Sequence, residues 1–225
     1  MKGARSVRRA AGALAALIAL SPLPCAAIDW LVFVVDRSNS IDERELALQR
    51  RAYIRLLSDA NVISALGNVH VAIVEFDTRA EIVVDWTDPQ NAARLYQRKS
   101  PDGLRGQTGI GGALGTALAL LVGKTGRLVI DISGDGKDNV DNTLLADMRA
   151  AADEQAVEIN GLAIMTPDVP EIDRYYSQWV VNGFVVPVEG TEDFQSALKR
   201  KLFYEIADAG PTSPGRAADL AAGVR

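Results

Sequence analysis

The feature that most constrains this sequence is an alternation of continuous apolar runs with segments of helical periodicity. The run "WLVFVV" at 30–35 is apolar at every position, and residues 42–59 then place apolar side chains three and four positions apart. A run without polar alternation is typical of a strand buried on both faces, whereas the second pattern is typical of an amphipathic helix. A chain with this alternation is expected to fold as a sheet between two layers of helices.

The alternation continues to about residue 207. Strands are predicted at 30–35, 69–76, 81–86, 127–133, 157–165 and 183–188. Helices are predicted at 42–59, 88–99, 109–123, 142–155, 169–181 and 191–207, with Thr191 capping the last. Most strands are joined through a helix, which makes them parallel, but the short segment "DTRA" between the second and third strands suits a hairpin. The sequence therefore predicts one α/β domain at 28–207, with a doubly wound, mostly parallel sheet, one antiparallel edge strand and helices on both faces.

Both ends of the chain are predicted to lie outside this domain. Residues 1–10 carry four basic residues and no acid, 11–20 are apolar, and "SPLPCAA" follows. This order is that of a signal peptide, here 1–27, and it predicts a periplasmic or secreted protein. The apolar stretch is shorter than the roughly 20 residues of a membrane span, so no stable membrane insertion of the mature chain is expected. The segment 208–225 is rich in Gly, Pro and Ala and is predicted to be a flexible tail.

Charge and cysteine content narrow the function classes. The chain has 24 basic and 29 acidic residues, and loss of the signal peptide would change the formal net charge from −5 to −9 because four basic residues leave with it. An acidic protein is poorly suited to bind nucleic acid or anionic lipid. The single cysteine, Cys25, lies within the signal peptide, so the mature domain has no disulfide and no thiol nucleophile.

Polar side chains follow the predicted strands where ligands bind in open α/β sheets, beyond the carboxyl ends of the strands. Asp36, Ser38 and Ser40 follow the first strand, Thr108 precedes the helix at 109–123, and Asp135 follows the strand at 127–133. Each of the three segments alone is typical of a turn or a helix cap. Together they place two carboxylates and three hydroxyls at one edge of the sheet, a ligand set that suits Mg²⁺, with Mn²⁺ or Ca²⁺ as substitutes.

Three motifs carry a resemblance to a known family. They are D-x-S-x-S at 36–40, T-x-x-G-x-A-L at 108–114 and D-G at 135–136. In this order they resemble the metal-ion-dependent adhesion site of von Willebrand factor A domains. The phrases "LQRRAY", "VIDISGDGKDN" and "INGLAI" also resemble a bacterial family of exported von Willebrand A-like proteins whose function is not known.

The resemblance implies a role for each residue of the motifs. Ser38, Ser40 and Thr108 would hold the metal through their hydroxyls, Asp36 and Asp135 would act directly or through water, and Gly136 would support them. The free coordination position would take an Asp or Glu carboxylate from a partner protein.

The sequence departs from the family pattern at three positions. Arg37 replaces a small or apolar residue and places a cation beside the site, Asn39 stands where Gly is frequent, and Gly134 stands where Thr is usual. Asp131 interrupts a strand that should be buried. One interpretation is that Asp131 orients Ser38 or a metal-bound water without being a ligand itself. The other is that it pairs with a nearby Lys or Arg at an exposed strand end.

Two other functions remain open. A metal-free scaffold would bind partners by surface alone, and Arg37 favours it. A metal-dependent hydrolase would use Asp135 or Asp131 with a metal-activated water. No Gly-x-Ser-x-Gly motif occurs, and the sole histidine, His70, is predicted to be a packed or edge residue of its strand. Trp30, Trp86 and Trp179 are predicted to be core or cap aromatics, and "LKRKL" at 198–202 a solvated helix face.

Overall fold

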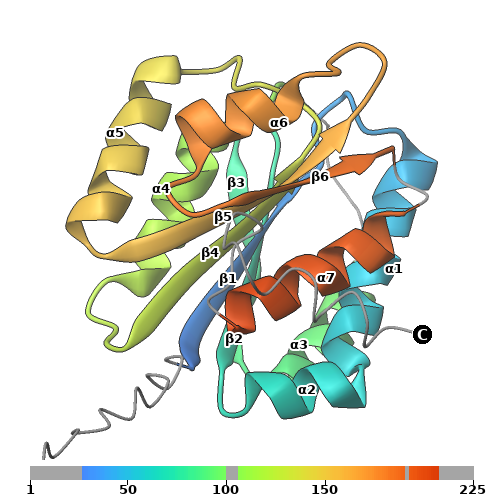
Figure 1. Ribbon diagram of the computed structural model, residues 1–225, viewed down its shortest axis with the longest axis vertical. Helices are drawn as coiled ribbons and strands as arrows, with labels where there is room; N and C mark the ends of the chain where they lie inside the picture. The colour runs from blue at the N-terminus through green and yellow to red at the C-terminus, as the bar shows by residue number, and fades with distance from the viewer. Residues whose placement is uncertain (1–26, 100–105, 191–192, 208–225) are drawn as a thin grey trace, which may run out of the picture.

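The computed structural model describes residues 27–99, 106–190 and 193–207, and it places a six-stranded sheet between two layers of helices (Figure 1). The strands are β1 (Ile28–Asp36), β2 (His70–Phe76), β3 (Ala80–Thr87), β4 (Arg127–Gly134), β5 (Val157–Met165) and β6 (Val185–Glu189). Their order across the sheet is β3-β2-β1-β4-β5-β6. Every described pairing is parallel except that of β2 with β3, so the predicted fold class, including its antiparallel edge strand, is confirmed.

The helices are α1 (Glu43–Ser58), α2 (Ala60–Leu66), α3 (Pro89–Arg98), α4 (Ile110–Leu121), α5 (Asn142–Glu154), α6 (Ile172–Tyr175), the π-helix η1 (Tyr176–Val180) and α7 (Phe194–Ile206). Helices α1, α2, α3 and α7 cover one face of the sheet, and α4, α5, α6 and η1 cover the other (Figure 1). The central strands therefore bury side chains of alternate positions in two separate cores, as their continuous apolar sequence requires.

The predicted helix at 42–59 is confirmed as α1, and a short second helix that was not predicted, α2, follows it directly. Asp42 begins α1 with a capping box, in which its side chain accepts from the Glu45 N–H and the Glu45 side chain accepts from the Asp42 N–H. Asp59 ends α1 in extended backbone, and its carboxylate accepts from the N–H groups of Asn61 and Val62 at the start of α2. The break therefore follows from the capping preference of Asp59, which helical periodicity alone does not reveal.

Several predictions made near the two ends of the chain lie outside the described residues. Helix α7 begins at Phe194, and Asp193 before it makes no side-chain capping bond. The predicted cap Thr191, residues 1–26 of the predicted signal peptide and the predicted tail 208–225 lie outside the described residues. Within the described ranges, no helix is both long and apolar enough to cross a membrane.

The three tryptophans do not all occupy the core. Trp179 is 52% exposed, so its assignment as a core or cap aromatic is wrong. Trp30 stacks on His70 with ring centroids 4.2 Å apart and meets Trp86 edge-on at 5.0 Å. His70 is exposed at the start of β2, as expected for an edge histidine.

Candidate metal centre

Three loops meet beyond the carboxyl ends of β1 and β4. These strands are parallel neighbours in which Val35 lies opposite Ser133, so Asp36 and Asp135 leave the sheet at the same edge. The loop before α4 joins them, because the Asn39 N–H donates to the Gly106 carbonyl at 3.0 Å. The sheet therefore brings together the three segments that sequence reasoning selected.

The predicted site side chains form a continuous chain of contacts, which we call the oxygen cluster (Asp36, Ser38, Ser40, Thr108 and Asp135). The Thr108 hydroxyl donates to Ser38 Oγ at 3.1 Å, and Ser38 Oγ lies 3.0 Å from Ser40 Oγ. The Ser40 hydroxyl in turn donates to Asp135 Oδ1 at 2.6 Å. Side-chain contacts therefore join four of the five residues, and Asp36 joins them through the Ser38 N–H, although Ser40 and Asp135 are 95 residues apart in the sequence.

Asp36 occupies the buried end of the oxygen cluster. Its Oδ1 accepts from the Ser38 N–H at 2.8 Å, whereas its buried Oδ2 has no hydrogen-bond partner among the described residues. Burial raises the pKa of Asp36 to about 7, the Ser38 N–H opposes the rise, and the Asp135 carboxylate adds to it. Burial also raises the pKa of Asp135, against the hydrogen bond from Ser40. Both carboxyl groups thus lie where a negative charge is poorly solvated.

The oxygen cluster is closed on most sides. Asp36 is fully buried, and Ser38, Thr108 and Asp135 are at most 4% exposed. Ser40 is exposed, so solvent reaches the cluster beside this residue.

The loop after β4 fixes Thr108 through its backbone. Asn139 Oδ1 accepts from the Thr108 N–H at 2.8 Å, and the Asn139 N–H donates to the Thr108 carbonyl at 3.0 Å. The neighbouring Asp138 carboxylate accepts from the Gly111 N–H in the first turn of α4 at 2.9 Å. Sequence reasoning missed the role of these residues in "SGDGKDN". The only local signal is that Asp and Asn side chains commonly accept from nearby backbone N–H groups.

Gly136 allows the loop after β4 to approach Thr108. A Cβ atom at this position would lie 2.9 Å from Thr108 Oγ1, closer than side-chain packing tolerates. A glycine is therefore needed for the two loops to meet.

Two of the departures from the family pattern have small structural consequences. The Arg37 guanidinium lies 3.7 Å from carboxylate oxygens of both Glu75 and Asp77 and 3.8 Å from Glu81. Acids of the β2–β3 hairpin thus balance the cation that the sequence places beside the site. Asn39 does not use a left-handed backbone, since Ala156 is the only described non-glycine residue with positive φ.

Asp131 does not orient Ser38 or a metal-bound water. Side chains alternate along β4, so Asp131 points to the face covered by α1 and α7, whereas Asp36 points to the face covered by α4 and α6. Asp131 is fully buried and forms an ion pair with Lys201 of α7 at 2.8 Å. The predicted pairing of Asp131 with a basic residue is therefore confirmed, but the pair lies in the core and not at an exposed strand end.

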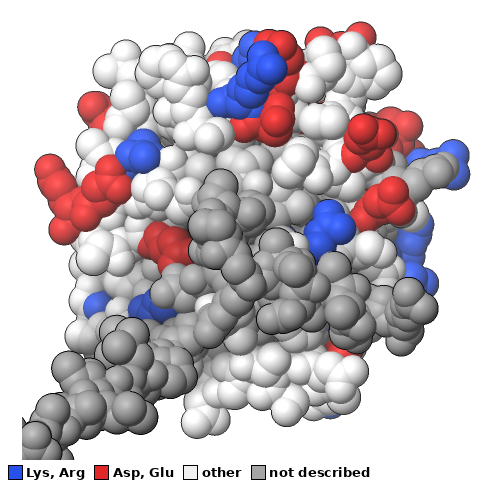
Figure 2. All heavy atoms as spheres, viewed as in Figure 1, with Lys and Arg blue, Asp and Glu red and all other residues white. Residues whose placement is uncertain are grey.

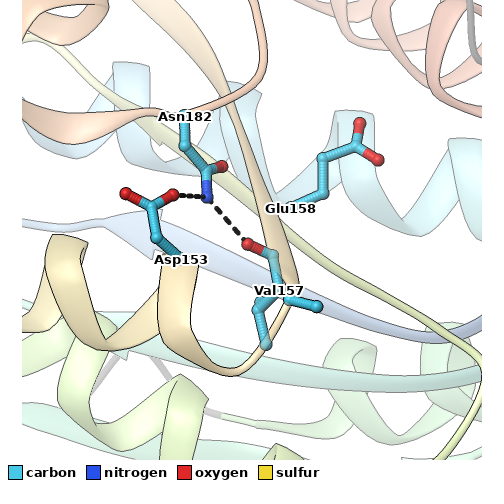
Figure 3. Close-up of a pocket in the computed structure, with 5 residues that line it drawn as sticks. Asp153, Val157, Glu158 and Asn182 are labelled. Carbon is cyan, nitrogen blue, oxygen red and sulfur yellow. Dashed lines mark hydrogen bonds between the residues drawn. The ribbon is translucent and has the colours of Figure 1, made fainter.

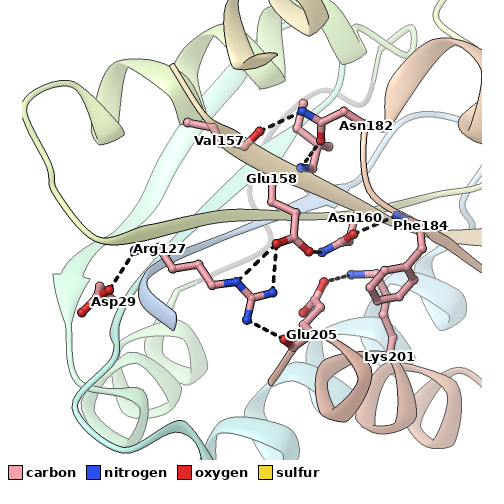
Figure 4. A network of polar contacts seen from close by, with 10 residues as sticks. Asp29, Arg127, Val157, Glu158, Asn160, Asn182, Phe184, Lys201 and Glu205 are labelled. Atoms are coloured by element: carbon pink, nitrogen blue, oxygen red, sulfur yellow. Dashed lines mark hydrogen bonds and ion pairs between the residues drawn. The ribbon is translucent and has the colours of Figure 1, made fainter. Parts of the chain in front are cut away.

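Lys201 also corrects the prediction for "LKRKL". Its side chain is fully buried, and Nζ lies 2.5 Å from Glu205 Oε1 as well as close to Asp131. Figure 4 shows Lys201 and Glu205 beside Phe184, and beside them Arg127 contacts Glu158 and the Glu205 carbonyl. We call Asp131, Lys201 and Glu205 the buried triad.

The buried triad makes stability depend on pH. Burial raises the pKa of Glu205 from 4.5 to about 8, Asp131 adds to the rise, and Lys201 opposes it. A carboxyl whose pKa is higher in the folded state contributes stability below its unfolded pKa and loses that contribution as pH rises to the folded value. We therefore expect this contribution to the free energy of unfolding to be lost between pH 4.5 and about 8.

Urea unfolding at several pH values measures this dependence, with Glu205→Gln as the comparison. The charged or titratable groups that surround Glu205 are Asp131, Lys201, Tyr53, Glu158 and Arg127. They are unchanged in Glu205→Gln, so the difference between the two proteins isolates Glu205. Equal pH dependence of the two proteins would show that Glu205 does not titrate in this window.

A hollow of about 280 Å³ lies at the opposite edge of the sheet, lined by Asp153, Ala156, Val157, Glu158 and Asn182. Figure 3 shows the Asn182 amide bridging the Asp153 carboxylate and the Val157 carbonyl. These residues surround the amino end of β5, so the hollow is separate from the oxygen cluster.

Within the described residues no group of three or more His, Cys, Asp or Glu side chains could hold a metal, so a metal at the oxygen cluster would depend on its hydroxyls.

Solved structures with the same fold define the class of protein. One is proximal thread matrix protein 1 from the mussel byssus with a zinc-occupied MIDAS motif, with TM-score 0.64, 18% identity and coverage of 81% of this chain and 46% of that chain. Another is BatB from Bacteroides thetaiotaomicron, with TM-score 0.59, 19% identity and coverage of 80% and 100%. A third is the vWF domain of the type V pili tip protein Mfa5 from Porphyromonas gingivalis, with TM-score 0.58, 11% identity and coverage of 84% and 98%. The protein thus has the von Willebrand factor A fold, and it spans about half the length of the byssus protein.

The family follows from sequence comparison. The chain belongs to the family described as "Protein of unknown function (DUF1194)", which matches residues 28–210. No curated protein matched the sequence.

Proposed function

We propose that the domain is an exported interaction module that binds a divalent cation, Mg²⁺ first, at the oxygen cluster and through it a carboxylate of a partner protein. The observation that carries the proposal is the convergence of Asp36, Ser38, Ser40, Thr108 and Asp135 from three separate loops. Export rests on the signal-peptide pattern at 1–27. The fold itself commonly mediates protein interactions.

The donor atoms fit a hard cation. The oxygen cluster offers hydroxyl and carboxylate oxygens and neither nitrogen nor sulfur, which favours Mg²⁺, Mn²⁺ or Ca²⁺. Asp36 Oδ2 is buried without a partner in the described structure, a state that costs free energy until a cation or a water meets it. A von Willebrand A-like neighbour holds zinc at its MIDAS motif, which supports a divalent cation at this position of the fold.

The partner is expected to approach beside Ser40. The other four residues of the oxygen cluster are buried, so Ser40 is where an incoming group could reach it. When bound, the cation would supply a positive charge and a free coordination position for an Asp or Glu side chain. On the face drawn in Figure 2, acidic and basic side chains lie interspersed where the described residues are visible.

Replacing Thr108 with valine tests the site, because the substitution keeps the shape of the side chain and removes its hydroxyl. In the wild type, Mg²⁺ at about 100 times its Kd should stabilise the fold by about 2.7 kcal/mol, seen as a rise in Tm by calorimetry. Thr108→Val should lose most of this rise. The matched control is Thr116→Val, whose hydroxyl bonds only to the Gly112 carbonyl in the described part of α4.

Two outcomes would contradict the proposal. Equal Mg²⁺-dependent rises in Tm for Thr108→Val and Thr116→Val would remove Thr108 from the site. Equilibrium dialysis without uptake of Mg²⁺ or Mn²⁺ by the wild type would favour the metal-free scaffold.

A further inference from the structure

The Tyr176 hydroxyl is a buried polar group that the oxygen cluster does not explain. Tyr176 is the first residue of the π-helix η1, its side chain is fully buried, and its hydroxyl has no hydrogen-bond partner among the described residues. A buried hydroxyl without a partner is costly, and π-helical turns occur frequently at functional sites. Both observations call for a role for this residue.

Two glycines make room for the Tyr176 ring on the sheet. A Cβ atom at Gly161 of β5 would lie 3.0 Å from Tyr176 Cδ1, and one at Gly134 of β4 would lie 2.5 Å from the Tyr176 hydroxyl oxygen. These strands are paired, with Ile132 opposite Gly161 and Gly134 opposite Ala163. The sheet surface thus accommodates the ring only because both positions lack a side chain.

The same glycine connects Tyr176 with the oxygen cluster. A Cβ atom at Gly134 would also lie 2.7 Å from Asp36 Oδ2, so the hydroxyl and the carboxylate oxygen border one small space. Tyr176 can donate a hydrogen bond and Oδ2 can accept one, and neither has another partner in the described structure. Gly134, one of the departures from the von Willebrand A pattern, leaves this space open.

We propose that Tyr176 is a positioning residue of the site, and that its hydroxyl donates to one water, which in turn donates to Asp36 Oδ2. A buried water of this kind satisfies both groups and is typical of polar spaces in protein cores. This water bridge holds the Asp36 carboxylate in the orientation in which Oδ1 accepts from the Ser38 N–H. The consequence for metal affinity rests on the proposed function, whereas the link between Tyr176 and Asp36 exists without metal.

The backbone of η1 supports this role. The Val181 N–H donates to the Tyr176 carbonyl at 3.0 Å, a bond that spans five residues and closes the π-turn. The preceding Tyr175 accepts through its hydroxyl from the Asp138 N–H at 3.1 Å. Two consecutive tyrosines therefore reach different parts of the site: Tyr175 reaches the loop after β4, and Tyr176 reaches the end of β1.

The test is a double-mutant cycle in chelator, which needs no metal. Urea unfolding of the wild type, Tyr176→Phe, Asp36→Ala and the double variant should show the two substitutions coupled by at least about fivefold in the unfolding equilibrium constant. The control is Tyr204→Phe, on the opposite face of the sheet, which should be additive with Asp36→Ala. Effects of Tyr176→Phe and Asp36→Ala that multiply within about twofold would overturn the proposal.

Two further measurements keep the inference separate from the proposed function. Should Asp36→Ala not fold, the tyrosine resonance Raman difference between wild type and Tyr176→Phe reports whether the Tyr176 hydroxyl donates, and a free hydroxyl overturns the proposal. Titration calorimetry should show Mg²⁺ affinity about tenfold weaker in Tyr176→Phe, whereas equal affinity removes its positioning role. A wild type that takes up no Mg²⁺ but shows the coupling refutes the proposed function and supports the link between Tyr176 and Asp36.

Discussion

Replacing Lys201 with methionine should lower the free energy of unfolding by about 3–5 kcal/mol, since it leaves a buried carboxylate without its cation. Methionine is similar in length to lysine and fits the same space without the charge. Lys201 and Asp131 are both fully buried, and their 2.8 Å ion pair joins α7 to β4. Lys201 also lies 2.5 Å from Glu205, so the substitution removes the cation from both carboxyl groups of the buried triad.

The matched control is Lys199→Met, two positions earlier on the same helix. Lys199 pairs with Asp59 at 2.6 Å, but both side chains are partly exposed, at 39% and 29%. An exposed pair of this kind contributes about 0–1 kcal/mol, so urea unfolding should separate the two variants clearly. Adding Asp131→Asn to Lys201→Met should recover part of the loss because it removes the buried charge. Similar, small effects of both lysine substitutions would show that water reaches the buried triad.

The sequence could predict that Lys201 is buried, but it could not predict the residue with which Lys201 pairs. Phe194, Ala197 and Leu198 are buried, and their spacing continues through 201, 202 and 205 on the same stripe of the helix. The stripe thus indicates that Lys201 and Glu205 face the sheet. It does not reveal Asp131, 70 residues earlier, as the partner that makes this burial tolerable.

The oxygen cluster was easier to predict, because its residues follow strands whose apolar pattern is strong. Asp36 and Asp135 are placed by the ends of β1 and β4, and parallel strands bring their carboxyl ends to one edge. Asn139 and Tyr176 could not be predicted in the same way. Asn139 bonds to the backbone of Thr108, and Tyr176 borders the space beside Gly134. Both arrangements form only once distant segments have packed together.

Replacing Gly111 with alanine should destabilise the protein by about 2–3 kcal/mol, because a Cβ atom there meets backbone and not a flexible side chain. That atom would lie 2.6 Å from the Leu145 nitrogen and 3.0 Å from the Leu144 carbonyl carbon, both in the first turn of α5. Neither atom can yield without moving the helix. Gly111 also donates to Asp138, so a shift of α4 would disturb the loop that fixes Thr108.

Gly112→Ala is the matched control, one position further along α4. A Cβ atom at Gly112 has no atom within 4 Å in the described structure, so the substitution should stabilise the helix by about 0.5–1 kcal/mol. Urea unfolding should therefore give opposite signs for the two neighbouring substitutions. Calorimetry should also find weaker Mg²⁺ binding in Gly111→Ala alone, since only that variant displaces Thr108. If Gly111→Ala were as stable as Gly112→Ala, the close contact of α4 with α5 would be ruled out, and the glycine in T-x-x-G would need another explanation.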